Sequence, residues 1–193
     1  GQPLRVLAAE SFLADIAQHV AGDRLTVDVL IPSGTDPHGF EPTPADVRKV
    51  ADSDLLIING AGLEAFLERL LENAGGERTV VEASAGLTSR TPHAAEAVDE
   101  AADEHADEED HGHSETDPHF WLDPVLVIKY VENIRDGLNA ADPAGAATYT
   151  ANAAQYIADL KVLDVWIVEQ VQAIPPERRL LVTNHESFGY FAD

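Results

Sequence analysis

The feature that most constrains the fold is an alternation of short apolar segments with segments of helical periodicity. Four apolar segments have the length of strands: 4–9, 26–31, 55–58 and 79–82. Between them, apolar side chains recur every three or four residues, which predicts amphipathic helices near 12–20, 43–52 and 63–71. Strands that alternate with helices indicate an α/β fold, with a mostly parallel sheet covered by helices on both faces.

The second half of the chain is dominated by predicted helices. Pro124 is expected to open a helix that runs to about Asn139, and a much longer helix is expected over 143–174. We interpret the apolar stripe of the long helix as core; its members are Tyr149, Tyr156, Leu160, Leu163, Ile167, Val171 and Ile174. Pro175 and Pro176 end this helix, and residues 180–183 predict another strand.

These segments predict three parts. Residues 1–142 form an N-terminal α/β lobe, residues 143–176 a long connecting helix, and residues 177–193 the start of a second α/β lobe. One strand and one turn do not make a domain. The strand at 180–183 is therefore expected either to join the first sheet or to belong to a second lobe that has been cut off.

The charge of the chain excludes some classes of function. There are 35 acidic and 12 basic side chains, so the net charge is -23. Nucleic-acid binding is excluded because phosphates favour a basic face, whereas a cationic ligand suits this charge. No apolar stretch approaches the roughly 18 residues of a membrane-spanning helix. The absence of cysteine excludes thiolate metal sites and disulfides.

An acidic, histidine-rich insertion at 93–117 differs from the rest of the first lobe. Residues 96–117 hold 11 acidic side chains, three histidines and no lysine or arginine. Such a segment buries little apolar surface, so we expect a mobile surface loop. Its histidines are candidates for weak metal capture, and the alternative is a solvated insertion without metal; they are His105, His111 and His113, with His93 at its start.

Three other histidines share a context that indicates a metal site. His38 and His119 each end an Asp-Pro-His tripeptide, and His185 directly follows the strand predicted at 180–183. Ligands of parallel α/β sheets bind outside the carboxyl ends of the strands. The prolines restrict the backbone before His38 and His119, which helps to fix the rotamer of a ligand.

Neutral imidazole binds zinc at about 2.0–2.1 Å, and a carboxylate or water completes a tetrahedron around three such donors. Any one of these histidines alone is better explained as a surface or capping residue. Two Asp-Pro-His tripeptides together with a histidine at a strand end favour a metal site over that explanation. His19 lies on the first predicted helix and is expected to be an ordinary surface residue.

The motifs resemble those of a known family, the zinc and manganese solute-binding proteins of bacterial ABC importers. The resemblance covers Asp36 to Pro44, the acidic insertion, Asp117 to Pro124, the long helix and Thr183 to Phe191. It implies two α/β lobes joined by the long helix, with the metal in the cleft between them. It also implies metal ligation by His38 and His119 from the first lobe and His185 from the second.

Histidine at the third position resembles the zinc branch of that family, since the manganese branch tends to carry glutamate there. The family's fourth, acidic ligand lies beyond Asp193, so the resemblance implies a C-terminally truncated chain. We therefore expect a protein of the periplasm or the extracytoplasmic face, with its export signal and any lipid anchor removed. It would capture Zn²⁺ (Mn²⁺ is less favoured) and deliver it to an ABC importer permease, with a zinc metallochaperone as a further candidate partner.

Two alternatives come from other functional classes. A zinc hydrolase would need a metal-bound water and a general base, for which Glu41 or Glu186 could serve. The helical His-Glu-x-x-His signature of such enzymes is absent after His185. A zinc buffer or adhesin would work through the acidic insertion instead.

Overall fold

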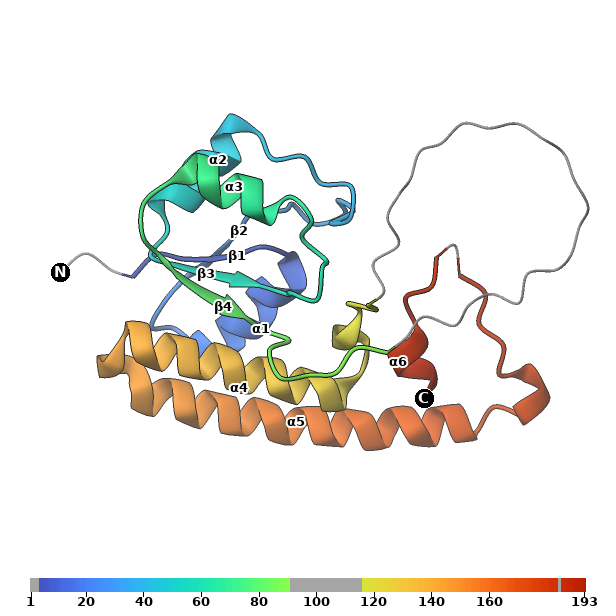
Figure 1. Ribbon diagram of the computed structural model, residues 1–193. Coiled ribbons are helices and arrows are strands. Elements are labelled where there is room, and N and C mark those ends of the chain that lie inside the picture. The colour runs from blue at the N-terminus through green and yellow to red at the C-terminus, as the bar shows by residue number, and fades with distance from the viewer. Residues whose placement is uncertain (1–3, 91–115, 184) are drawn as a thin grey trace, which may run out of the picture.

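A four-stranded parallel sheet forms the centre of the molecule (Figure 1). The computed structural model describes residues 4–90, 116–183 and 185–193. The strands lie in the order β2-β1-β3-β4; they are β1 (Val6–Ala8), β2 (Val27–Val29), β3 (Leu55–Ile58) and β4 (Thr79–Glu82). The α/β fold and the positions of these four strands confirm the sequence-based expectation.

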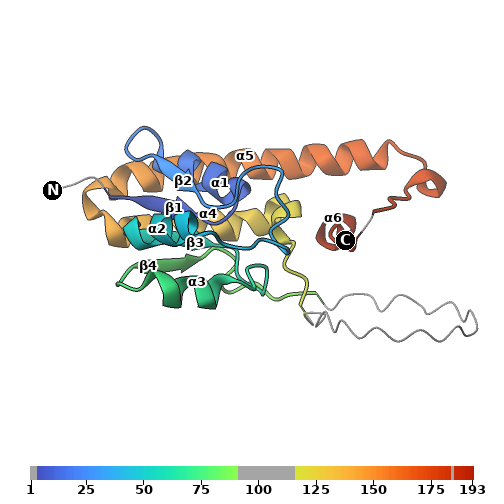
Figure 2. The same ribbon diagram turned by 90° about the horizontal axis from the view of Figure 1, so that it is seen from above.

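Helices cover both faces of the sheet (Figure 2). On one face lie α2 (Pro44–Asp52) and α3 (Leu67–Ala74). The other face carries α1 (Ser11–Ala21) and α4 (Pro124–Ala141), with α5 (Ala146–Gln172) packed on both of them. The remaining helical segments are the short turns Phe120–Leu122, Pro143–Gly145 and Pro176–Arg178 and the single-turn α6 (Gly189–Ala192). In the described part of the chain, no helix is long and apolar enough to cross a membrane.

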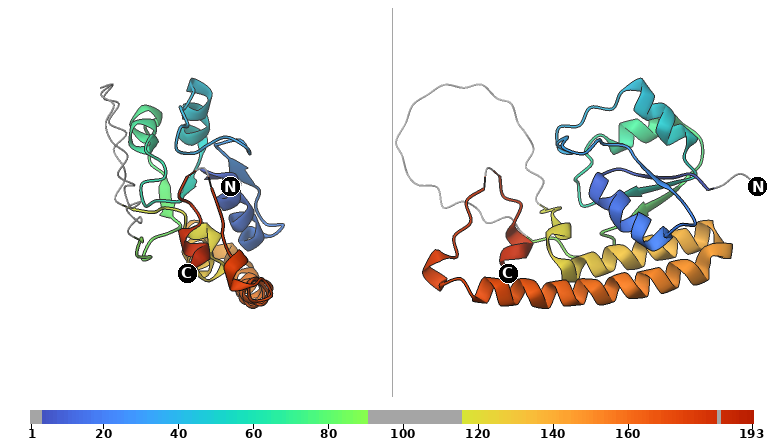
Figure 3. Two further views of the ribbon diagram at one scale, coloured as in Figure 1. Left: turned by 90° about the vertical axis from the view of Figure 1, so that its right-hand side faces the viewer. Right: turned by 180° about the vertical axis from the view of Figure 1, so that it is seen from behind.

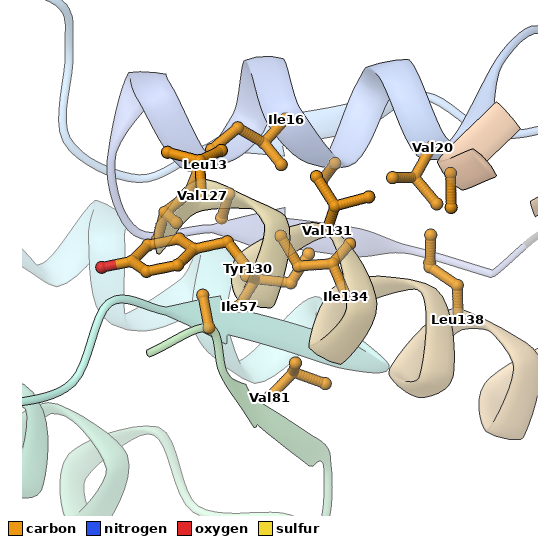
Figure 4. Packing of buried hydrophobic residues seen from close by; sticks show 14 of the residues in the cluster. Leu13, Ile16, Val20, Ile57, Val81, Val127, Tyr130, Val131, Ile134 and Leu138 are labelled. Carbon is orange, nitrogen blue, oxygen red and sulfur yellow. The ribbon is translucent and has the colours of Figure 1, made fainter. Parts of the chain in front are cut away.

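Alternating side chains of the central strands enter two separate cores. In β3, Leu55 and Ile57 belong to the core shared with α1, α4 and α5, whereas Leu56 and Ile58 belong to the core beneath α2 and α3. This burial on both faces explains why the strand is a continuous apolar run rather than an alternating one. Figure 4 shows the larger core, in which side chains of α1 and α4 interdigitate above Ile57 and Val81.

Local sequence signals set several helix boundaries as expected. Thr43 caps α2 in a capping box with Asp46, and Pro44 occupies the first helical position. The third helix begins later than predicted, at Leu67. Before it, Gly60, Ala61 and Gly62 all have positive φ angles, which excludes a right-handed helix there. Residues 63–66 have no helix assignment either, so the predicted helix start at residue 63 is wrong.

The long helix α5 is core along only part of its length. Its buried residues include Tyr149 and Leu160, but Leu163 and Ile174, also predicted to be core, are exposed, because this end of the helix extends past α4 and the sheet (Figure 3). An apolar stripe is buried only where another element covers it. The interpretation of the whole stripe as core is therefore wrong for its second half.

The strand predicted at residues 180–183 is also absent. These residues have no strand assignment, and Leu180 and Val182 are each 83% exposed. Apolar and β-branched residues form a strand only beside another strand that accepts their backbone hydrogen bonds. None of the four strands of the described sheet pairs with this segment. The division into parts at 142 and 176 remains a prediction.

Candidate metal centre

Three histidines from distant parts of the chain meet beyond the carboxyl ends of the strands. His38 lies in the loop that follows β2, His119 precedes the turn Phe120–Leu122, and His185 precedes α6. The Nε2 atom of His119 lies 3.3 Å from Nε2 of His38 and 3.3 Å from Nε2 of His185. One potential ligand atom of each histidine lies within 4.8 Å of those of the other two.

This spacing suits a tetrahedral metal ion. Donor atoms at zinc bond lengths of 2.0–2.1 Å lie about 3.3–3.4 Å apart along an edge of the tetrahedron. The two separations from His119, both 3.3 Å, match that edge. The three imidazoles can therefore present their lone pairs to one ion and leave a fourth position for another ligand.

The two Asp-Pro-His tripeptides form the same local turn. The backbone N–H of His38 donates to Oδ1 of Asp36 at 3.0 Å, and that of His119 donates to Oδ1 of Asp117 at 3.0 Å. An aspartate that accepts from the amide two residues later closes an Asx-turn. Both histidines therefore leave the turn from a backbone that the preceding aspartate holds.

Asp117 also holds the ring of His119. Its Oδ1 atom lies 2.7 Å from Nδ1 of His119, and both side chains are buried. A proton on Nδ1 leaves the Nε2 lone pair free, which is how carboxylates orient metal-binding histidines. Burial lowers the pKa of His119 below its ordinary value, against the raising effect of Asp117. The imidazole is therefore neutral at pH 7, the form that binds a metal.

The loop after β3 supports the backbone next to His119. Nδ2 of Asn59 donates to the carbonyl oxygen of Pro118 at 3.1 Å, and Oδ1 of Asn59 accepts from the Tyr130 hydroxyl at 2.5 Å. All three polar groups lie in the interior, where an unmade hydrogen bond is costly. The position of His119 thus depends on α4 and on the loop that follows β3.

A tyrosine of α6 holds the C-terminal segment against the sheet-bearing part of the molecule. The Tyr190 hydroxyl donates to the carbonyl oxygen of Asp117 at 2.8 Å and accepts from the backbone N–H of Arg90 at 2.9 Å. Its ring packs on Phe120 with centroids 4.7 Å apart. Arg90 also forms an ion pair with Asp193 at 3.1 Å. These contacts place His185, five residues before Tyr190, beside His119.

A cavity of about 980 Å³ lies next to the three histidines and touches them through His38. It lies between the loop after β2 and α3, and its lining includes Glu41, Phe40, Phe66 and Arg69. His119 and His185 do not line it. Glu41, one of the two general bases considered for a hydrolase, therefore lines a space that reaches only one edge of the histidine cluster, and Glu186 does not line it.

The other histidines fall outside the cluster. His19 lies on α1 and stacks on Tyr156 with ring centroids 4.9 Å apart, as a surface residue does. The proposed weak sites at His105, His111 and His113, and His93 beside them, lie outside the described residues. Sequence reasoning did not assign roles to Asp117, Asn59 and Tyr190. An aspartate two residues before each of two histidines was the visible signal for Asp117.

Comparison with known protein families finds one match along almost the whole chain. The family described as "Zinc-uptake complex component A periplasmic" matches residues 6–193. The manganese-binding lipoprotein MntA of Halalkalibacterium halodurans is 39% identical over 193 residues. That alignment covers 100% of this chain and 58% of the relative, so the chain spans little more than half of the relative's length.

Solved structures of similar fold include proteins with different bound metals. Zn(II)-bound AdcA from Streptococcus pneumoniae superposes with a TM-score of 0.79 at 30% identity, covering 99% of this chain and 37% of that one. The Mn-bound periplasmic metal-binding protein from Candidatus Liberibacter asiaticus gives a TM-score of 0.79 at 28% identity, covering 98% and 65%.

Proposed function

Because the chain belongs to the family of periplasmic zinc-uptake components, we propose that it binds a divalent metal ion outside the cytoplasm and delivers it to an ABC importer permease. The observation that supports the proposal is the convergence of three histidines, in which the Nε2 atoms of His38 and His185 each lie 3.3 Å from Nε2 of His119, the separation expected along an edge of a tetrahedral site. The ion is cargo, so the protein must hold it and release it without covalent chemistry. A zinc metallochaperone is left out of the proposal because no described contact points to one.

We propose Zn²⁺ as the preferred ion over Mn²⁺. Imidazole nitrogen suits zinc, whereas manganese prefers carboxylate, carbonyl and water oxygen. All three converging side chains are histidines, and the buried His119 is held neutral with Nε2 free. The names of the relatives include both metals, so the donor set of this chain is the argument for zinc.

The three proposed ligands differ in burial, and we propose that they differ in role. His119 is buried and held by Asp117, so it can serve as a fixed donor. His38 and His185 are exposed, and they can approach or leave the ion with little change in the core. A site with one fixed and two accessible donors suits an ion that must later be released.

Zinc titration by calorimetry tests the proposal on four variants: His38→Ala, His119→Ala, His185→Ala and His19→Ala. Loss of a direct ligand should weaken zinc binding by roughly 100-fold or more, beyond the 10–100-fold typical of groups that only orient a ligand. His19→Ala is the control and should stay within about twofold, because its ring packs on Tyr156 instead. A normal affinity in any of the first three variants would contradict the three-histidine site.

Competition between zinc and manganese tests the choice of metal. If the donor set decides the preference, zinc should displace manganese at equal concentration. His185→Glu adds an oxygen donor, so it should reduce the difference in affinity between the two metals. Manganese that binds the unaltered chain as tightly as zinc would refute the proposed preference. Family membership and the histidine cluster would be unaffected by that result.

The hydrolase alternative is testable with the same zinc-loaded protein. The cavity beside His38 has room for a small substrate, and Glu41 lines it. We expect no hydrolysis of activated esters above the rate of free zinc, and no change on Glu41→Gln. The buffer or adhesin alternative depends on histidines outside the described residues.

A further inference from the structure

Two interacting glutamates are buried in the loops that follow the two central strands of the sheet. Glu10 directly precedes α1 after β1, and Glu64 lies in the turn after β3. They are 3% and 7% exposed. β1 and β3 are the two central strands, and their helices leave to opposite faces of the sheet, so both glutamates lie where the strand order reverses. Two ionised carboxylates in such a place would repel each other strongly.

The two carboxyl groups have different surroundings. The Glu64 carboxylate accepts the backbone N–H of Asn59 at 2.5 Å and that of Gly60 at 3.1 Å. Both carboxyl oxygens of Glu10 are buried, and they have no hydrogen-bond donor among the residues that the structure describes. Donors therefore favour the ionised form of Glu64, whereas for Glu10 the cost of burial outweighs the favourable effect of its own backbone N–H on the charged form.

We propose that Glu10 keeps its proton at neutral pH and donates it to the Glu64 carboxylate, and that this acid–carboxylate pair positions the loop that supports His119. With that proton, the Glu64 carboxylate receives three hydrogen bonds and the charge of the pair is -1. Glu10 and Glu64 are positioning residues, because neither is one of the converging metal-binding groups.

The connection to the metal centre runs through Asn59. The Glu64 carboxylate holds the backbone of Asn59, whose side chain donates to the carbonyl oxygen of Pro118, the residue before His119. A displaced Glu64 would release the Asn59 backbone and, through it, the backbone that carries His119. This part of the inference rests on the proposed metal site, whereas the shared proton does not.

The electrostatics of the pair agree with this geometry. Burial, and then the negative charge of Glu64, raise the pKa of Glu10 to about 9, and a hydrogen bond to Glu64 acts in the same direction. Burial also raises the pKa of Glu64, against the effect of the two N–H donors. Tyr130 lies near both glutamates, and the other titratable groups that raise its pKa are Tyr190 and Glu82. These groups are neutral or negative, so none of them could balance a second carboxylate charge.

A held proton has a measurable consequence for the metal-free chain. Between the unfolded-state pKa of about 4.3 and the folded-state pKa of about 9, the folded chain holds one proton that the unfolded chain has lost. The contribution of Glu10 to stability must therefore fall as pH rises through this window, and it should change the unfolding constant by about tenfold per pH unit. Glu10→Gln supplies an N–H donor without a titrating proton, so it should remove this dependence.

Urea unfolding without metal at pH 6, 7 and 8 tests the shared proton. The ratio of the unfolding constant of the parent chain to that of Glu10→Gln should rise about 100-fold from pH 6 to pH 8. Glu68→Gln, on the exposed surface of α3, is the matched control, and its ratio should stay constant. A constant ratio for Glu10→Gln would overturn the proposal. So would a requirement for added Na⁺ or Ca²⁺, since a cation would then occupy the place of the proton.

Zinc affinity at pH 7 tests the positioning role and the place of the proton. Glu10→Gln should bind zinc within about threefold of the parent, whereas Glu64→Gln should bind at least about tenfold more weakly, because an amide cannot accept both N–H groups through two oxygens. Equal losses in the two variants would overturn the assignment of the proton to Glu10. An unchanged affinity in Glu64→Gln would overturn the positioning role. If the parent chain binds no zinc, the proposed function fails, and the urea series still decides the shared proton.

Discussion

His119 and His185 reach the same point from two differently built regions of the molecule. His119 belongs to the body around the sheet; it is 6% exposed, and Asp117 holds its ring. His185 belongs to the C-terminal segment, residues 179–193. In this segment Leu180 and Val182 are exposed to solvent, and α6 is a single helical turn. The first proposed ligand is already fixed by contacts within the body. The second depends on a few contacts, chiefly those of Tyr190.

This difference implies two roles for a metal ion bound at the proposed site. In the body, the Nε2 donor of His119 is already oriented by Asp117, so metal binding requires little ordering of side chains there. On the side of residues 179–193 the ion adds a link between His185 and the body, so part of its binding free energy should stabilise that segment. Metal binding and docking of the C-terminal segment should therefore be coupled, and four experiments test this contrast.

The largest effect should come from a cavity in the body. Leu138→Ala removes a fully buried side chain of α4 and should lower the free energy of unfolding by about 2–5 kcal/mol. Leu180→Ala removes a side chain that is 83% exposed and should change it by less than about 0.5 kcal/mol. Urea unfolding measures both. A large loss in Leu180→Ala would show that residues 179–183 are packed in solution.

Acid should weaken metal binding and also the body itself. Histidines must be neutral to bind zinc, and their ordinary pKa is about 6.5, so affinity should fall about 100-fold or more from pH 7 to pH 5. In the metal-free chain, the lowered pKa of His119 means that the unfolded state takes up a proton that the folded state resists. The contribution of His119 should therefore make the chain less stable as pH drops below about 6.5, opposite in sign to the contribution of Glu10, and His119→Gln should lack it. Zinc affinity that stays flat over this range would exclude histidine ligands.

The two Asp-Pro-His turns allow a matched comparison. Asp117 holds both the backbone and the ring of His119, whereas Asp36 is hydrogen-bonded to the backbone of His38. Asp117→Asn should therefore weaken zinc binding by about 10–100-fold, and Asp36→Asn by only a few-fold. Calorimetry at pH 7 measures both variants. Equal losses would mean that the turn, rather than orientation of the ring, is what the aspartates contribute.

The smallest effect should come from loosening the C-terminal segment. Tyr190→Phe removes the hydroxyl that joins α6 to Asp117 and Arg90, at a cost of about 1–1.5 kcal/mol. Zinc affinity should fall about tenfold, because the ion must then help to hold His185 in place. The control is Tyr156→Phe, a substitution of the same kind on α5, and it should leave affinity unchanged. If both variants bind zinc with the affinity of the parent chain, zinc binding does not depend on the contacts of the Tyr190 hydroxyl.

The sequence-based errors concentrate in the second half of α5 and in residues 179–183. Residues 163–174 have the pattern of a core helix face, yet Leu163 and Ile174 are exposed and Ile167 and Val171 are only partly buried. Residues 180–183 have the pattern of a strand and remain exposed. Periodicity reports which side chains would gain from burial, but burial needs a partner surface, and the described part of the chain supplies none there. In the body every predicted strand has a neighbour, and the predictions were confirmed at all four strands.

The sequence alone determined the α/β class, the capping of α2, and three histidines with a common metal chemistry. Those features depend on local periodicity, short hydrogen-bonded turns and side-chain type, which act over a few residues. Only the tertiary structure decided that Nε2 of His119 lies 3.3 Å from both partners, that Asp117 orients its ring and that Tyr190 brings His185 to it. It also placed Glu10 against Glu64, 54 positions apart in the chain. These contacts join residues far apart in sequence, and they form only when sheet, helices and C-terminal segment pack together.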